Sequence, residues 1–215
     1  MSRKDKLEGS VEAITPQAGL KLQEASKRVG SLPPYTARLL TWSFCLGVLP
    51  PAALVVALQL KSLLLLEYVH VISGGTWTGI DLFMGVIFGR MLAEFDIAGR
   101  VEVAKRLTPI TFFFLPSLAS TAITAGIYLS QALGTFDLHS PWIIAAGVVV
   151  LVLTAQGFGI FMPNSMRIFI ELAKPSPNMA KIARLNGINI KLSAVQGVMQ
   201  LAIIFIMAHL AVYPP

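Results

Sequence analysis

Five long apolar segments, separated by short polar connections, dominate the pattern of hydrophobic and polar positions along the chain. Each segment is long enough to cross the hydrocarbon core of a bilayer, which takes roughly 20 apolar residues. Lone strands of this length would leave backbone groups unpaired in lipid, so we predict five α-helices. The predicted spans are residues 39–60, 63–92, 107–133, 142–161 and 188–212.

This pattern predicts an all-α fold, an integral membrane bundle of five transmembrane helices. Residues 36–215 form the membrane domain, and residues 1–35 form a polar N-terminal segment with a weakly amphipathic stretch, Ala18–Val29. The first apolar run begins too late for an ordinary secretory signal peptide, so we expect the N-terminus to be retained. A very tight turn must join the first two spans, and the paired prolines Pro50 and Pro51 predict a kink in the first.

Lysine and arginine alternate between the connections. Seven precede the first span, and the connections that follow hold one, four, none and five, with none in the C-terminal tail. By the positive-inside rule this alternation places the N-terminus inside and the C-terminus outside. A four-span alternative that omits residues 39–60 would leave seven basic residues outside. We therefore expect a multi-pass protein of the cell membrane.

The composition supports a lipid environment. Only 13% of residues are charged, whereas a soluble domain has about 25%, and the mean hydropathy is +0.71. The net charge of +6 would suggest nucleic acid in a soluble chain, but membrane orientation explains it here, and we expect no nucleic-acid partner. The single Cys45 excludes a disulfide within the chain and any cysteine-based zinc motif.

The second predicted span carries the most informative polar residues. At 3.6 residues per turn, His70, Gly74, Trp77 and Asp81 fall on one face, with Glu67 at its edge. Ionisable groups at this depth are costly and by default mark a functional site. Gly74 leaves a shallow place where a neighbouring backbone or a flat cofactor could approach. The alternative is a packing surface in which His70 donates to a carbonyl or hydroxyl of another helix.

All three histidines are expected on the outer side, and this is the best chemical hint in the sequence. Neutral imidazole is an axial ligand of haem iron, so His70 and His209 are the candidate metal ligands, with Gly74 and Trp77 beside the cofactor. Without a CxxCH motif the haem would be a non-covalent b type. The alternatives are an interfacial polar residue for His209 and a solvated loop residue for His139.

Asp81 requires a partner if it is charged. Lys191 is a plausible one, although His70 to Asp81 spans about 16 Å of helix and Lys191 to His209 about 27 Å. The ion pair and a His70–His209 ligand pair are therefore difficult to form together. The alternatives for Asp81 are an arginine or a protonated state. Further intramembrane polar groups that can bond between helices are Gln156, Gln196 and Gln200.

One stretch resembles a known superfamily. Its pattern is a histidine early in a span, small residues, Trp-x-Gly, an inner arginine, a basic connection and a proline-containing next span that closes with glycine. The corresponding positions are His70, Gly74-Gly75, Trp77-Thr78-Gly79, Arg90, Lys105-Arg106, Pro109 and Gly126. This resembles the four-helix superfamily of the copper-resistance D membrane proteins and the HemJ-type protoporphyrinogen oxidases, here with one extra N-terminal span.

The resemblance implies haem b on the first-helix histidine, which is His70. HemJ-type proteins also carry a lysine shortly after a tryptophan in the following helix, whereas Trp142 is followed by Ile-Ile-Ala-Ala-Gly. That departure argues against protoporphyrinogen oxidation. The scattered methionines give copper transport little support.

Three functional hypotheses follow. The first is a haem b protein that transfers electrons near the outer face, within a larger redox complex. The second is a cofactor-free accessory subunit of a membrane complex, or a homo-oligomer, associated through GxxxG spacings such as Gly75–Gly79. The third is an ion or metal transporter or proton relay that uses Glu67, Asp81 and Lys191. No motif of a soluble enzyme is present, and the sequence leaves open whether the chain is an enzyme.

Overall fold

The computed structural model describes residues 34–213. The amphipathic stretch Ala18–Val29 and nearly all of the predicted segment 1–35 lie outside the described residues. Within the described part every element is helical, as the sequence predicts. Five helical rods are long and apolar enough to cross a membrane, and at most 28% of the most apolar window of each is buried within the bundle. The remaining apolar surface suits lipid, as in a multi-pass membrane protein.

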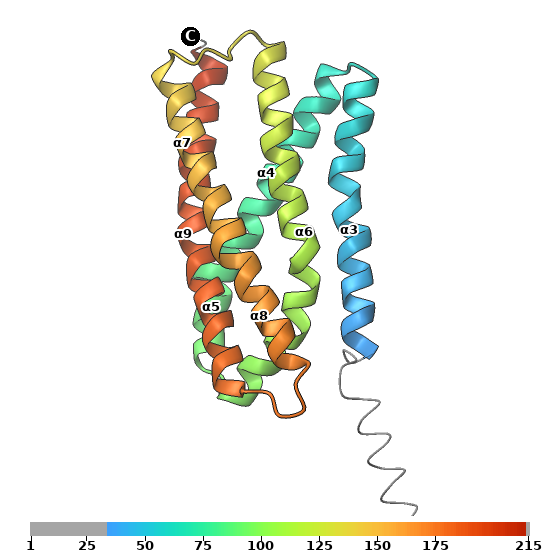
Figure 1. Ribbon diagram of the computed structural model, residues 1–215. Helices are drawn as coiled ribbons and strands as arrows, with labels where there is room; N and C mark the ends of the chain where they lie inside the picture. The colour runs from blue at the N-terminus through green and yellow to red at the C-terminus, as the bar shows by residue number, and fades with distance from the viewer. Residues whose placement is uncertain (1–33, 214–215) are drawn as a thin grey trace, which may run out of the picture.

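The rods follow one another in antiparallel order (Figure 1). The second rod continues from an α-helix through a π-helix into a short α-helix, and the fourth does the same. The elements are α3 (Pro34–Gln59), α4 (Leu63–Leu82), η1 (Phe83–Phe88), α5 (Gly89–Ala93), α6 (Ile97–Ala132), α7 (Pro141–Gln156), η2 (Gly157–Phe161), α8 (Met162–Leu172) and α9 (Met179–Val212).

Four rods extend at least five residues beyond the predicted spans. The α3 helix begins at Pro34 rather than 39, α6 at Ile97 rather than 107 and α9 at Met179 rather than 188, and the fourth rod ends at Leu172 rather than 161. The predicted limits followed apolar composition, whereas a helix of 36 residues is about 54 Å long and extends beyond a core of about 30 Å. Its first turn is capped by Asp96, whose Oδ1 accepts from the Gly99 amide at 2.8 Å.

The tight turn between the first two spans is confirmed. Leu60 and Lys61 form the turn, and Lys61 has a φ of 49°, in the left-handed region. Ser62 then caps α4 by accepting a hydrogen bond from the Leu65 amide at 3.3 Å. The α3 helix continues through Pro50 and Pro51 without a break in its helical assignment.

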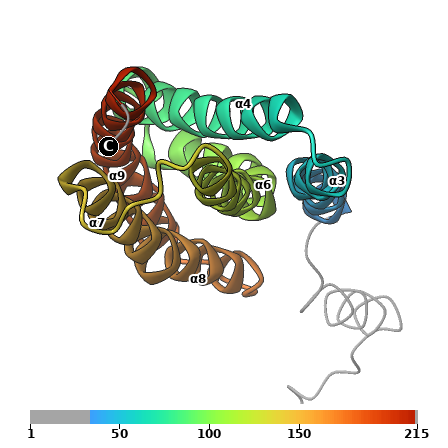
Figure 2. The same cartoon turned by 90° about the horizontal axis from the view of Figure 1, so that it is seen from above.

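The α6 helix stands at the centre of the bundle. Seen from above, α4, α9, α7 and α8 form a curved wall around it, and α3 packs outside against α6 and α4 (Figure 2). The α4 helix crosses the bundle, because it begins beside α3 and reaches α9 at its other end (Figure 1). This crossing decides which polar residues of α4 meet α9.

The two ends of the bundle differ in charge. Of the eleven Lys and Arg residues within 34–213, ten lie toward the end formed by α5, the start of α6 and the start of α9, here called the basic end. Only Lys61 lies at the opposite end, with the turns at 60–62 and 133–140.

Candidate functional site

His70 packs against α6. Its Nδ1 lies 2.8 Å from the carbonyl oxygen of Ala122, and because a carbonyl only accepts, Nδ1 carries the proton. A Cβ on Gly126 would lie 2.7 Å from Cε1 of His70, so this glycine is what lets the ring approach α6. The space beside Gly74 faces Ala122 of the same helix. The structure thus shows the hydrogen bond to a carbonyl of another helix that the packing interpretation predicts, whereas the haem interpretation of His70 stays a prediction.

His209 has different neighbours. Its ring stacks on Trp142, with centroids 3.8 Å apart and planes at 19°, and its buried Nδ1 has no hydrogen-bond partner. At this end of the bundle α4 lies beside α3 and α9 lies beside α7, with α6 between the two pairs (Figures 1 and 2). The predicted pairing of His70 and His209 on one iron does not fit this arrangement. The crossing of α4 separates His70 from His209, and this crossing cannot be predicted from the sequence of the chain alone.

Asp81 lies in the middle of the bundle with an exposure of 1%. Its Oδ2 accepts a hydrogen bond from Nε2 of Gln200 at 2.9 Å, and Ser193 and Trp77 lie beside the same carboxylate. The ion pair predicted with Lys191 is absent from the salt bridges of the described residues. Lys191 is exposed on α9, so its helical face turns away from Asp81.

The other predicted partners do not reach this carboxylate either. Arg106 pairs with Glu102, with 3.0 Å between Nη2 and Oε1, and Arg184 is exposed. Glu67 is exposed near the start of α4, away from Asp81. The intramembrane polar set predicted from the sequence therefore separates into one buried carboxylate and two exposed charges.

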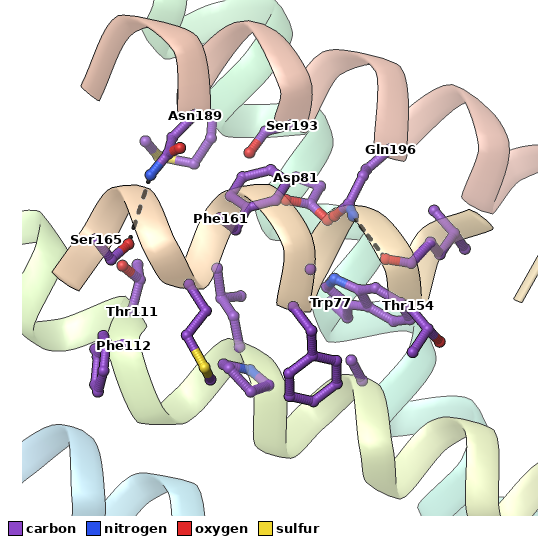
Figure 3. Close-up of a pocket in the computed structure, with 18 of the residues that line it drawn as sticks. Trp77, Asp81, Thr111, Phe112, Thr154, Phe161, Ser165, Asn189, Ser193 and Gln196 are labelled. Atoms are coloured by element: carbon purple, nitrogen blue, oxygen red, sulfur yellow. Dashed lines mark hydrogen bonds between the residues drawn. The ribbon is translucent and has the colours of Figure 1, made fainter. Parts of the chain in front are cut away.

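A cavity of about 310 Å³ opens beside Asp81, between α4, α6, α9 and the fourth rod (Figure 3). One wall is polar and comes mainly from one face of α9, at the helical spacing i, i+3, i+7, i+10. The opposite wall is mostly apolar and comes from α6, η2 and α8. The α9 residues are Asn186, Asn189, Ser193 and Gln196, and the apolar wall includes Leu115, Ala119, Ile123, Phe158 and Phe161.

Asp81 is the single ionisable side chain among the described residues that line the cavity. The surrounding amides are held in place: Gln196 donates to the Leu153 carbonyl at 3.3 Å, and Asn164 donates to Asn189 at 3.0 Å. The Nδ2 of Asn186 is buried on the same wall without a hydrogen-bond partner. The cavity thus offers one acidic group, one unsatisfied donor and no basic side chain.

Both π-helices border this cavity. The η1 helix begins two residues after Asp81, and η2 contributes Gly157, Phe158 and Phe161 to the lining. Single π-helical turns inside α-helices are rare and occur frequently at functional sites. In η1, Gly85 packs directly on the backbone of Ala194 in α9, which brings the two helices together next to Asp81.

The cavity opens sideways rather than at an end of the bundle. The exposed residues of its lining are in α6 and η2: Ser120, Thr124 and Phe158, the last with an exposure of 59%. All three belong to helices long and apolar enough to cross a membrane. With these helices in a bilayer, this mouth would face the lipid.

A comparison of the chain with protein-family models, with curated proteins and with solved structures finds no match. The site must therefore be interpreted from its own geometry. Within residues 34–213, no cluster of three or more His, Cys, Asp or Glu side chains is placed to hold a metal ion.

The sequence identified Trp77 and Asp81 as one face of a span, and Gln196 and Gln200 as polar groups that bond between helices. It missed Asn186, Asn189 and Ser193 as a site. Their helical spacing with Gln196 is visible in the sequence, but without the crossing of α4 nothing linked that face to Asp81.

Proposed function

We propose that this protein binds a small lipid-soluble molecule from the bilayer in the cavity between α6, α9 and the fourth rod, with Asp81 as its polar anchor. The observation that carries the proposal is a carboxylate, 1% exposed, on the wall of a cavity whose mouth lies within candidate membrane spans. Burying a carboxylate without a cation costs free energy. A helix bundle with a purely structural task has no need of such a residue, so by default it marks a functional site.

The lining suits an amphiphile better than an ion or a sugar. Most of the lining surface is apolar. The carboxylate and the amides lie on α4 and α9, and hydroxyl groups of serine and threonine are spread over α6, α7 and α8. Binding sites for small molecules generally combine apolar walls with a few placed polar groups. A transporter that uses Glu67, Asp81 and Lys191 together is less compatible with this geometry. Glu67 and Lys191 are exposed, and of the three only Asp81 lies at the site.

The binding can be tested with Trp77, which lines the cavity. Trp42→Phe and Trp142→Phe leave it as the only tryptophan of the chain. The protein in lipid nanodiscs is titrated with a brominated single-chain alcohol and with the corresponding amine, since bromine quenches tryptophan fluorescence. We expect quenching that saturates for at least one of the two probes.

Ala119→Phe is the decisive variant, because Ala119 lies on the apolar wall and is not fully buried. The added ring should fill the cavity and abolish the saturable component. Ala155→Phe is the matched control, on an exposed face of α7 outside the lining. Quenching that rises without saturation in every variant, as for a tryptophan in plain bilayer, would contradict the proposal.

A second candidate is the haem b electron-transfer protein that the sequence resemblance implies, and one hydrogen bond of His70 is compatible with it. Histidines that bind metals commonly donate their other ring N–H to a carbonyl, as His70 does to Ala122. Its Nε2 has no hydrogen-bond partner among the described residues. A haem held there through His70 alone would supply one-electron transfer, and the second axial ligand would have to come from elsewhere than His209.

The absorption spectrum of the purified protein, oxidised and dithionite-reduced, separates the two candidates. A haem protein shows a Soret band that His70→Ala removes and Asp81→Asn retains. A colourless preparation from haem-supplemented cells excludes the haem candidate and leaves the binding proposal standing.

Two further parts of the proposal concern the protein's setting. The charge difference between the ends supports a cytoplasmic basic end in the cell membrane, with the C-terminus outside.

Association with another subunit or a second copy is supported by Gly75 and Gly79, which are exposed and have nothing within 4 Å of the position that a Cβ would take. Cysteine cross-linking between α4 helices in native membranes tests that association.

A further inference from the structure

The polarity of the cavity points to one class of occupant. Resting on the binding function proposed above, we infer that the ligand is a single-chain amphiphile with a cationic amine head, and that the amine pairs with Asp81. The inference follows from the charge, the shape and the mouth of the cavity.

The part of the cavity lining that the structure describes carries one acidic group and no basic one. Asp81 is the only ionisable side chain among the described lining residues, and its neighbours Gln200, Ser193 and Trp77 are neutral. A carboxylate removed from water needs a positive partner or several hydrogen bonds. Gln200, Ser193 and Trp77 supply hydrogen bonds to the carboxylate. The described part of the chain provides no cation here, so a ligand that brings a positive charge is the complementary group. An acidic ligand would place two negative charges together.

The cavity is elongated along α6. The cavity extends along α6 from Thr124 to Leu107, which at 1.5 Å per residue is about 25 Å of helix. A cavity of about 310 Å³ that follows one helix over this length suits an extended alkyl chain.

The position of the mouth sets the orientation of the ligand in the cavity. Ser120, Thr124 and Phe158 are exposed to the lipid side, whereas Asp81 lies behind them with an exposure of 1%. The amine head therefore enters first and reaches Asp81, and the chain follows between Leu115, Ala119 and Phe158. The unsatisfied Nδ2 of Asn186 provides a donor for a hydroxyl or carbonyl on the same ligand.

The experiment compares head groups on one chain. Brominated alkylamine, alcohol and carboxylic acid of equal chain length are titrated into nanodiscs that hold the variant with Trp77 as its only tryptophan. We expect the amine to bind roughly tenfold more tightly than the alcohol, the difference between a charge-assisted and a neutral hydrogen bond. The acid should bind most weakly.

Asp81→Asn should reduce the affinity for the amine to that of the alcohol and leave the alcohol unchanged. Glu67→Gln is the matched control, because Glu67 is a carboxylate of the same helix that is exposed and outside the cavity; it should leave the preference intact. Saturable binding of the alcohol by Asp81→Asn also shows that this variant is folded.

Two outcomes would overturn the inference, and they differ in what else they affect. Equal saturable affinity for amine and alcohol, unchanged by Asp81→Asn, refutes the cationic head but retains a ligand in the cavity. No saturable binding of any probe, in wild type as in Ala119→Phe, refutes the binding function together with the inference.

Discussion

Gln200 and Asp81 join two helices at the centre of the bundle: Nε2 of Gln200 donates to Oδ2 of Asp81 at 2.9 Å, across 119 positions of sequence. Both side chains are 1% exposed. The bond therefore holds the carboxylate beside the cavity and joins α4 to α9.

Gln200→Leu should therefore destabilise the protein. The variant leaves a buried carboxylate without its closest donor, for which we expect a loss of about 1–3 kcal/mol. Unfolding in mixed micelles, followed by circular dichroism, measures the change. Gln156→Leu is the matched control, because the Gln156 amide reaches only the sulfur of Met199 at 3.9 Å and its Oε1 is unpaired; its stability should be unchanged or slightly higher. Equal losses in both variants would contradict the assigned role of Gln200.

Two glycines of the second rod should respond oppositely to alanine. A Cβ on Gly85 would overlap the backbone of Ala194, which cannot move aside, so Gly85→Ala should cost roughly 1–3 kcal/mol or prevent folding. Gly75 has nothing within 4 Å, so Gly75→Ala should gain helix propensity, up to about 1 kcal/mol. The melting temperature of each variant in detergent gives the comparison, and a stable Gly85→Ala would disprove the close packing of η1 on α9.

The carboxylate of Glu171 holds the connection between α8 and α9. It is 3% exposed and accepts from Lys174 Nζ at 2.9 Å, Lys181 Nζ at 2.8 Å and the Asn178 amide at 3.2 Å. Glu171→Gln should lower the melting temperature and speed proteolysis in residues 173–178, because the two lysines and the Asn178 amide lose the buried, charged acceptor that holds them.

Glu102→Gln is the comparison for Glu171. Glu102 also pairs with two basic residues, Lys105 at 3.6 Å and Arg106 at 3.0 Å, but its side chain is 49% exposed. Exposed pairs contribute roughly 1 kcal/mol or less, so this variant should stay close to wild type. A larger effect of Glu102→Gln than of Glu171→Gln would show that burial does not govern these carboxylates.

The loop 133–140, at the end of the bundle opposite the basic end, contains a pH-dependent contact. The backbone amide and the ring of His139 donate to Oδ1 of Asp137 at 2.9 and 3.1 Å, and they lower the pKa of that carboxyl below its usual value. Since the folded pKa is the lower one, the contact contributes fully above the ordinary aspartate pKa of about 3.9 and is lost as pH falls through the folded value.

A titration followed by NMR should therefore find Asp137 ionising below the ordinary value. In His139→Ala the backbone amide, the largest cause of the shift, remains, so the pKa should rise only part of the way. A pKa at the ordinary value in wild type would contradict the loop geometry.

Much of the fold follows from the sequence, because lipid restricts five apolar segments to helices. The helix limits did not follow, since Ile97–Arg106 and Met179–Gly187 are polar yet remain helical, started by the caps Asp96 and Asn178. Burial of Asp81 follows from its apolar surroundings, whereas its partner does not. The sequence predicts Lys191 as the partner and identifies Gln200 only as one of three polar groups that can bond between helices, whereas the structure brings Gln200 to Asp81.

The position of His209 illustrates the same limit. Its place near the end of the last apolar segment follows from the sequence, but its neighbour Trp142 follows from the pairing of α7 with α9. Position within a segment is a local property of sequence, whereas the order of helices around α6 is set by packing between distant segments. The candidate site depends on that order.

The most direct measurement is a crystal structure grown from a lipid phase in the presence of the brominated alkylamine. We expect anomalous bromine density in the cavity between α6 and α9, with the amine nitrogen about 3 Å from a carboxylate oxygen of Asp81. Bromine density only on the outer surface, with Asp81 enclosed by side chains or paired with a lysine or arginine, would contradict this expectation.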